Sequence, residues 1–325
     1  MRYLVRRLMR AALLLLGVSV LCFLFTEMAP GSFFEEMRLN PQIAPETIAS
    51  LESRYGMDRP LVERYRRWLK SAAHADFGHS IAYNVPVAPL LWSRARNTLL
   101  LNGAAMGLTW LIAVPLGVWA AARRGRTLDH AVAAGSALLV SIPEVVIAMA
   151  LLALAVRSRV VPVGGMSSVD HDGLSQWARV RDVAGRMLLP TIILTLAESA
   201  IIVRHVRASV LEVLGAPLAQ AARGLGIGEG RLLLRHVLPV AASPAISLFG
   251  FSLAGLISGS LLVEVVCGWP GLGPLILDAT LSRDFYVVIG AIMLSAVFMV
   301  GGNVIADILL LACDPRIRTG AADAS

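Results

Sequence analysis

Long apolar runs separated by shorter polar segments dominate the pattern of this chain. The runs cover Met9–Ala29, Thr98–Ala121, Ala131–Val156, Leu188–Leu211, Val240–Val266 and Val287–Ala312. A helix needs about 20 predominantly apolar residues to cross the hydrocarbon core of a bilayer, and each run reaches that length. The pattern therefore predicts an all-α polytopic membrane protein with about six transmembrane helices.

Composition agrees with this prediction. Hydrophobic residues make up 57% of the chain and charged residues only 16%, whereas soluble domains contain roughly 25% charged residues. The net charge of +7 does not indicate nucleic-acid binding, because arginines at the cytoplasmic ends of spans fix topology and meet the lipid headgroups of the bilayer. The cysteines Cys22, Cys267 and Cys313 have unrelated spacing and predict neither a disulfide frame nor a metal site.

The distribution of arginine predicts the orientation of the spans. Arginines flank the runs at alternate segments: Arg2, Arg6, Arg7, Arg10, Arg123, Arg124, Arg126, Arg223, Arg231, Arg235, Arg316 and Arg318. By the positive-inside rule these segments are cytoplasmic, and so are both termini. The expected organisation is an N-terminal arm and first span (1–29), an external segment (30–96), a helical core (97–318) with a cytoplasmic loop (212–239), and a C-terminal tail (319–325).

Small residues and prolines recur inside the predicted spans. Gly103-x-x-x-Gly107 and Gly255-x-x-x-Gly259 fit the small-residue pattern that lets helices approach closely in lipid, either within one subunit or between subunits. Pro115, Pro143 and Pro244 are expected to kink their spans, because proline removes a helix hydrogen bond.

The cytoplasmic loop carries the most specific pattern of the chain. Gln220-Ala221-Ala222 is followed by three residues and Gly226, then by nine residues and by His236-x-Leu238-Pro239. Its glycines predict two short helices joined by a bend, with Gly226 and Gly228 giving the backbone its freedom. The pattern resembles the EAA loop of ABC importer permeases, with Gln220 in place of Glu and His236 in place of the usual aliphatic residue.

Other segments narrow the resemblance. The opening Met-Arg-Tyr-Leu-Val-Arg-Arg-Leu and the segments 55–60, 76–80, 268–273 and 314–318 are similar in sequence and order to the oligopeptide, dipeptide and nickel class, specifically to the first permease subunit. The resemblance implies the MetI-like fold of type I importers. It also implies as partners a second homologous permease, two cytoplasmic ABC ATPase subunits and an external solute-binding protein, around a multi-pass protein of the cell inner membrane. The carried solute stays open between peptides, dipeptides, glutathione and nickel chelates.

The residues of the loop agree with a coupling role. The chain has no G-x-x-x-x-G-K-[ST] sequence, so no Walker A loop binds ATP here and no cofactor is expected. A short helix over Glu229–Leu234 is expected to meet a groove on the ATPase, with Arg223, Arg231 and Arg235 as ion-pair partners and Leu232 and Leu233 as the apolar anchor. The predicted coupling residues are Gln220, Ala221, Ala222, Arg223, Gly226, Glu229, Arg231, Leu232, Leu233, Arg235, Leu238 and Pro239. The alternative is an amphipathic connector lying on lipid headgroups.

Two carboxylates fall inside predicted spans, Glu144 in the third and Glu198 in the fourth. Charged groups at this depth are costly unless they face a bundle interior or water, so both are hypothesised to line the translocation path and to favour cationic solutes. The alternatives for both are internal hydrogen bonding to hydroxyls and pairing with the partner permease. Arg204, His205 and Arg207, near the cytoplasmic end of the fourth span, are expected to anchor at headgroups.

On the external side, Glu264 and the turn at Trp269, Pro270 and Gly271 predict a short re-entrant helix that forms a gate or a dock for the binding protein. A capped turn is the alternative. The sequence Asp170-His171-Asp172 is expected to be a solvated loop and not a metal site, because consecutive residues rarely direct their side chains to one ion.

The leading functional prediction is an importer permease that hydrolyses nothing itself. A carrier driven by an ion gradient is the alternative, and it would predict repeated, interrupted helices that the sequence lacks.

Overall fold

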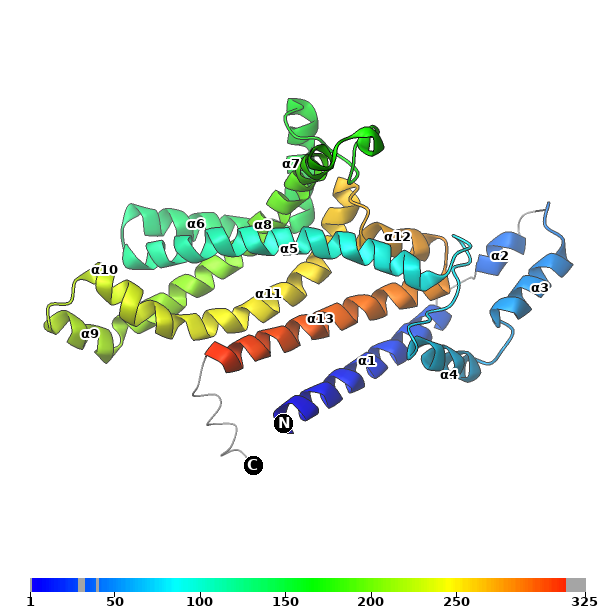
Figure 1. The fold of residues 1–325 in the computed structure, drawn as a ribbon, viewed down its shortest axis with the longest axis horizontal. Coiled ribbons are helices and arrows are strands. Elements are labelled where there is room, and N and C mark those ends of the chain that lie inside the picture. The colour runs from blue at the N-terminus through cyan, green and yellow to red at the C-terminus, as the bar shows by residue number, and fades with distance from the viewer. Residues whose placement is uncertain (1, 29–32, 39–40, 314–325) are drawn as a thin grey trace. The chain divides into compact units, whose positions relative to one another are not determined.

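The computed structural model describes residues 2–28, 33–38 and 41–313, which are mostly helical (Figure 1). The helices of these ranges are α1 (Arg2–Met28), α2 (Phe33–Arg38), α3 (Pro45–Tyr55), α4 (Leu61–Ala72), α5 (Val87–Ala122), α6 (Thr127–Ser141), α7 (Glu144–Ser158), the 3₁₀ turn η1 (His171–Gly173), α8 (Gln176–Gly215), α9 (Pro217–Gly224), α10 (Glu229–Leu232), the π-helical turn η2 (Leu233–Val237), α11 (Leu238–Cys267), α12 (Leu272–Leu281) and α13 (Phe285–Cys313). No β-strand forms within the described ranges, so the predicted all-α class is confirmed. The segment 314–318 and the tail 319–325 lie outside the described residues.

The helices provide enough apolar length for a polytopic protein. Among the described residues, α1, α5, α8 and α13 are each long and apolar enough to cross a bilayer. The pair α6 and α7 and the pair formed by the end of α11 and α12 pass the same test only as bent units, which gives between 4 and 6 spans. Which side of the membrane holds the termini stays a prediction.

The third apolar run is not the single kinked span that the sequence predicted. Helix α6 ends at Ser141, α7 begins at Glu144, and the two axes differ by 99°. The cause is local: Ile142, the residue before Pro143, is extended at φ −95° and ψ 125°, the conformation that a following proline imposes. In contrast, α5 continues through Pro115 and α11 through Pro244.

The chain forms two compact units, Met1–Thr98 with Pro270–Phe298, and Leu99–Trp269 with the residues from Met299 onward. In the first unit, Phe23, Trp68, Phe285 and Ile289 form an aromatic and aliphatic core. The ring of Phe23 meets the edges of Phe285 and Tyr65 at centroid distances of 4.8 Å and 5.1 Å.

Segments that the sequence marked by resemblance have a structural role in this first unit. The Asp284 carboxylate, which is buried, accepts hydrogen bonds from Ser80 Oγ at 2.6 Å and from the backbone N–H of Ala82 at 3.0 Å. The hydroxyl of Tyr286 donates to the carbonyl of Tyr55 at 3.0 Å. These bonds tie the segment 55–82 to Asp284, between α12 and α13, and to Tyr286 at the start of α13.

The second unit is built around α8, which packs against α6, α7 and α11. One core cluster includes Leu101, Ile193 and Trp269, and a second includes Val206, Val210 and Leu232. Gly117 of α5 allows a close approach to α8, because a Cβ there would lie 2.9 Å from the carbonyl oxygen of Val203. Gly103 and Gly107 meet nothing within 4 Å, so this predicted pair does not pack against another helix of the described chain.

Candidate functional site

The loop after α8 forms the helix–bend–helix that the sequence predicted. Helix α8 ends where Ala216 adopts an extended conformation, and Pro217 then starts α9, a position that suits its fixed φ and missing N–H. Gly226 has φ 77°, a left-handed conformation that glycine adopts without strain, whereas Gly228 has an ordinary φ of −63°. Only Gly226 therefore requires glycine for the bend.

An ion pair braces this bend. The guanidinium of Arg223, in the last turn of α9, donates from Nε to Glu229 Oε1 at 2.7 Å and from Nη2 to Glu229 Oε2 at 3.3 Å. The same guanidinium donates from Nη1 to the carbonyl of Leu214 at 3.2 Å, near the end of α8. The hydrogen bonds from Arg223 lower the pKa of Glu229, and Glu229 in turn raises the pKa of Arg223. Arg223 is thus engaged within its own chain.

The loop has one buried face and one exposed face. Ala219, Ala222 and Leu232 are buried against Val206 and Val210 of α8. The predicted apolar anchor is therefore wrong for Leu232, whose side chain is 0% exposed and fills the core. Leu233 is half-buried against the same core.

Other leucines form the exposed apolar surface of the loop. Leu225 is 82% exposed, Leu234 68% and Leu218 58%. The remaining predicted coupling residues divide between surface and core edge: Gln220, Ala221, Arg223, Gly226, Glu229, Arg231, Arg235 and Pro239 are exposed, and Leu238 is half-buried. Sequence reasoning missed the three exposed leucines, because a pattern of residue types does not say which leucine faces inward.

A π-helical turn joins the loop to α11. The expected helix over Glu229–Leu234 is shorter, because α10 ends at Leu232 and the backbone continues as a π-helix over Leu233–Val237. Such turns are rare and occur often at functional sites. Pro239 is the second residue of α11, directly after this turn.

Glu144 lies at the break between α6 and α7 and not in the middle of a continuous span. It occupies the first turn of α7, where the unpaired backbone N–H groups favour a carboxylate. Its carboxylate also lies against α11, since a Cβ at Gly259 would be 3.1 Å from Glu144 Oε2. In the predicted Gly255-x-x-x-Gly259 pair, Gly259 therefore leaves room for the carboxylate of Glu144.

Glu198 lies on α8 within electrostatic reach of Glu144. Both side chains are half-buried, and no hydrogen bond or ion pair joins either carboxylate to another of the described residues. The structure thus brings the two predicted carboxylates together in one helical unit. Their contact with a solute stays a prediction.

The predicted external dock is buried. Glu264 is 0% exposed and Trp269 1%, and Gly271 is buried as well, while Pro270 is half-buried. Trp269 packs in the core cluster with Leu101 and Ile193. As dock residues Glu264, Trp269 and Gly271 are wrong, because buried side chains offer a partner no surface. The predicted short helix does follow the turn, as α12, and the gate role stays a prediction.

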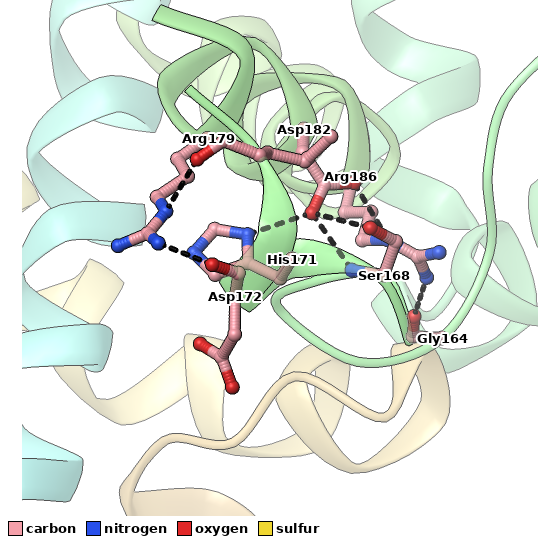
Figure 2. Close-up of polar contacts among 8 residues, drawn as sticks. Gly164, Ser168, His171, Asp172, Arg179, Asp182 and Arg186 are labelled. Atoms are coloured by element: carbon pink, nitrogen blue, oxygen red, sulfur yellow. Dashed lines mark hydrogen bonds and ion pairs between the residues drawn. The ribbon is translucent and has the colours of Figure 1, made fainter. Parts of the chain in front are cut away.

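A polar hub braces the loop between α7 and α8 (Figure 2). Asp182 accepts hydrogen bonds from Ser168 N at 2.7 Å and Ser168 Oγ at 3.0 Å, and its Oδ2 lies 2.9 Å from His171 Nδ1. Arg186 contacts Asp182 Oδ1 at 3.4 Å and donates to the carbonyl of Gly164 at 2.6 Å. His171 is therefore a structural residue, and no group of three potential metal ligands forms in the described part of the chain.

A second polar contact was missed by sequence reasoning. Asp129, at the start of α6, accepts from Arg207 Nε at 2.5 Å and from Arg207 Nη2 at 2.9 Å. Arg207 was expected to anchor at headgroups, yet it holds a buried carboxylate. The two residues are 78 positions apart, so no local pattern reveals the pair.

Comparisons with known proteins identify the family. The family model of binding-protein-dependent transport system inner membrane components matches residues 113–319, and the model of the N-terminal part of such membrane components matches residues 1–96. The oligopeptide transport system permease protein AppB of Bacillus subtilis is 33% identical over 97% of this chain and 99% of the relative. The dipeptide transport system permease protein DppB of Escherichia coli is 32% identical over 98% of this chain and 99% of the relative.

Solved structures agree at the level of the fold. Inward-facing MetNI methionine ABC transporter structures share 18% and 19% identity with this chain, with TM-scores of 0.56 and 0.57. Each comparison covers 69% of this chain and 96% of the other. Together with the matched family models and the relatives above 30% identity, this likeness leads to one assignment. The chain belongs to the family of binding-protein-dependent transport system inner membrane components, as a multi-pass importer permease of the inner membrane.

Proposed function

We propose that this permease forms half of the pathway of an ATP-driven importer for peptides or similar small polar solutes. Its proposed partners are a second homologous permease, two cytoplasmic ATPase subunits and an external solute-binding protein. The names of the relatives, which are oligopeptide and dipeptide permeases, support peptides as the solute class. Family membership decides against a carrier driven by an ion gradient.

The coupling loop carries the proposal. Its α9–α10 bend buries one face against α8 and leaves Leu218, Leu225 and Leu234 exposed among polar residues. Apolar side chains in such a position mark a contact with a partner protein. A groove on the ATPase receives Leu225 and Leu234, while Arg231 and Arg235 supply ion pairs at its rim.

The loop is built to transmit movement as one piece. The Arg223–Glu229 pair closes the bend, and the bond from Arg223 to Leu214 joins it to the end of α8. Ala222 and Leu232 pack it against the same helix. Rocking of the ATPase subunits therefore moves α8 with the loop, and rigid-body movement of this kind alternates access in transporters.

The translocation path is proposed to run along the break between α6 and α7. Interrupted helices at membrane depth are tolerated where they face protein or a water-filled cavity, and transporters use them to build solute sites. Glu144 and Glu198 give this region negative charge, which favours the amino terminus of a peptide or a cationic side chain.

External docking is proposed for the loop before α8 in place of the buried turn at Trp269. Val160 is 81% exposed, Val169 103% and Trp177 84%, while the Asp182 hub holds the loop in shape. Trp177, exposed in the first turn of α8, is of the residue type that most often anchors a protein partner.

Affinity purification in mild detergent tests the coupling role. The tagged wild-type chain is expected to retain a second permease and ATP-binding subunits. Leu225→Glu with Leu234→Glu is expected to lose the ATP-binding subunits and keep the second permease, whereas the control Val169→Glu keeps the ATP-binding subunits. Retention of the ATPases by the double variant would refute the docking surface.

Transport in vesicles tests the energy source and the path. Uptake is expected with ATP and without an ion gradient, and uptake by this chain alone in liposomes would contradict the proposal. Glu144→Gln with Glu198→Gln is expected to reduce uptake of cationic peptides more than that of neutral ones. Equal uptake of both classes by this variant would remove the path-lining role.

A further inference from the structure

A cavity of about 770 Å³ opens beside the coupling loop, within the second unit. It is lined by the last turn of α5 and the α5–α6 turn on one side, and by the end of α8, α9, α10 and the π-helical turn on the other. Its volume is in the range of small-molecule sites, which is about 300–1,000 Å³. The coupling role proposed above does not use this cavity.

The cavity has an excess of positive charge. Four arginines line it (Arg123, Arg124, Arg126 and Arg223), against a single carboxylate, Glu229. Glu229 is already engaged by Arg223, as described above.

The acidic residue in the first turn of α6, Asp129, is also engaged. Asp129 accepts from Arg207 and from the backbone N–H of Gly125 at 2.9 Å. Arg123, Arg124 and Arg126 thus form no ion pair with any carboxylate of the described residues. Three clustered arginines without counter-charge attract an anion, and arginine binds phosphate through paired hydrogen bonds.

The residues that line the cavity are of the types found where a span meets the lipid headgroups. Trp119 lines it and is 46% exposed, with the guanidinium of Arg123 4.9 Å from the ring centroid. Tryptophan is enriched where a span leaves the hydrocarbon core, and Trp119 lies in the last turn of the apolar helix α5. Leu211 and Leu214 add an apolar wall that suits the glycerol and upper acyl part of a lipid.

We propose that this cavity binds the phosphate headgroup of an anionic phospholipid from the cytoplasmic leaflet. Basic pockets between spans on this side bind multiply charged headgroups, so cardiolipin, with two phosphates, binds more tightly than phosphatidylglycerol. Because Gly230 and Leu233 also line the cavity, the bound lipid bridges the α5–α6 turn and the coupling loop. The lipid thereby holds the loop against the membrane-spanning part.

Lipid titration of the purified complex tests this site. Delipidated complex in detergent is titrated with cardiolipin, phosphatidylglycerol, phosphatidylcholine or inorganic phosphate, and binding is followed by native mass spectrometry and thermal unfolding. Cardiolipin and phosphatidylglycerol are expected to bind and to raise the unfolding temperature, and the other two are not. Each arginine contributes about five-fold in affinity for anionic lipid, so Arg124→Gln with Arg126→Gln weakens cardiolipin binding about twenty-five-fold.

The controls separate charge from folding and from other occupants. Arg181→Gln removes an exposed external arginine and is expected to bind cardiolipin as the wild type does. Arg124→Lys with Arg126→Lys keeps the charge and is expected to recover most of the affinity. Equal binding of phosphatidylcholine, equal protection by inorganic phosphate, or unchanged cardiolipin affinity in the glutamine variant would overturn the proposal. So would loss of ATPase co-purification with unchanged lipid affinity, because an acidic face of the ATPase would then be the occupant.

Discussion

Replacing Asp129 by asparagine tests whether a buried ion pair fastens α6 to α8. The side chain of Asp129 is 4% exposed and that of Arg207 29%. Asparagine keeps the size of the side chain but removes its charge and one acceptor. The change therefore leaves the Arg207 guanidinium without its partner and weakens the bond to the backbone of Gly125.

The structure sets the expected magnitude. Removing one partner of a buried ion pair costs about 3–5 kcal/mol, because an uncompensated charge remains. Arg207 keeps access to water over part of its side chain, so the lower end applies, about 3 kcal/mol. This corresponds to about a hundred-fold change in the unfolding equilibrium constant.

Equilibrium unfolding in mixed micelles with increasing dodecyl sulfate measures this loss. Asp170→Asn, at an exposed carboxylate, is the matched control and is expected to leave the midpoint unchanged. Adding Arg207→Met to Asp129→Asn removes the stranded charge and is expected to recover part of the stability. The reasoning fails if Asp129→Asn unfolds like the control, or if the two substitutions destabilise additively.

Three further changes test other contacts. Gly117→Ala brings a Cβ to 2.9 Å from the backbone oxygen of Val203, so α5 and α8 separate and stability falls by about 1–3 kcal/mol in the same assay; an unchanged midpoint would contradict this close approach. Asp284→Ala removes the acceptor of the hydrogen bonds from Ser80 at 2.6 Å, Ala82 at 3.0 Å and Val287 at 3.4 Å. The change is expected to speed proteolysis of the segment 73–86, whereas wild-type cleavage rates would disprove its bracing role. The pKa of Glu229 is lowered by Arg223, so the pair's contribution is complete above the ordinary Glu value of 4.5 and is lost as pH falls through the lowered folded value. Both side chains are exposed, so this loss is at most about 1 kcal/mol. The protection factors of the amides at 223–229, which are corrected for the intrinsic pH dependence of exchange, are expected to fall at acid pH in the wild type and to show no such step in Arg223→Gln.

The loop between α8 and α11 illustrates how far local pattern carries a prediction. The spacing from Gln220 to Pro239 predicted the bend, and Gly226 adopts the left-handed conformation that glycine permits. The same pattern misassigned Leu232, because adjacent leucines in a short helix point in different directions. Only packing against α8 decides which of them is buried.

Glu144 and Glu198 also show that local sequence predicts a residue's type of environment but not its place in the fold. Their depth in apolar runs marked Glu144 and Glu198 as unusual, since charge in a membrane requires a reason. The apolar run did not predict that Glu144 begins a new helix, whose axis differs by 99° from that of α6. The extended conformation of Ile142 before Pro143 is a local effect, but the surroundings of Glu144 are set by α8 and α11, which both pack against α7.

The sequence by itself determined the class, the apolar lengths and the family pattern of this protein, because hydrophobic runs and short motifs act through neighbours along the chain. The tertiary structure decided the contacts between distant residues: Asp129 with Arg207, Asp284 with Ser80, and the burial of Trp269. These contacts depend on which faces of the helices pack together, and one helix packs against several neighbours. The ion pairs and the buried residues at helix–helix contacts are therefore set by the tertiary fold and not by the local sequence.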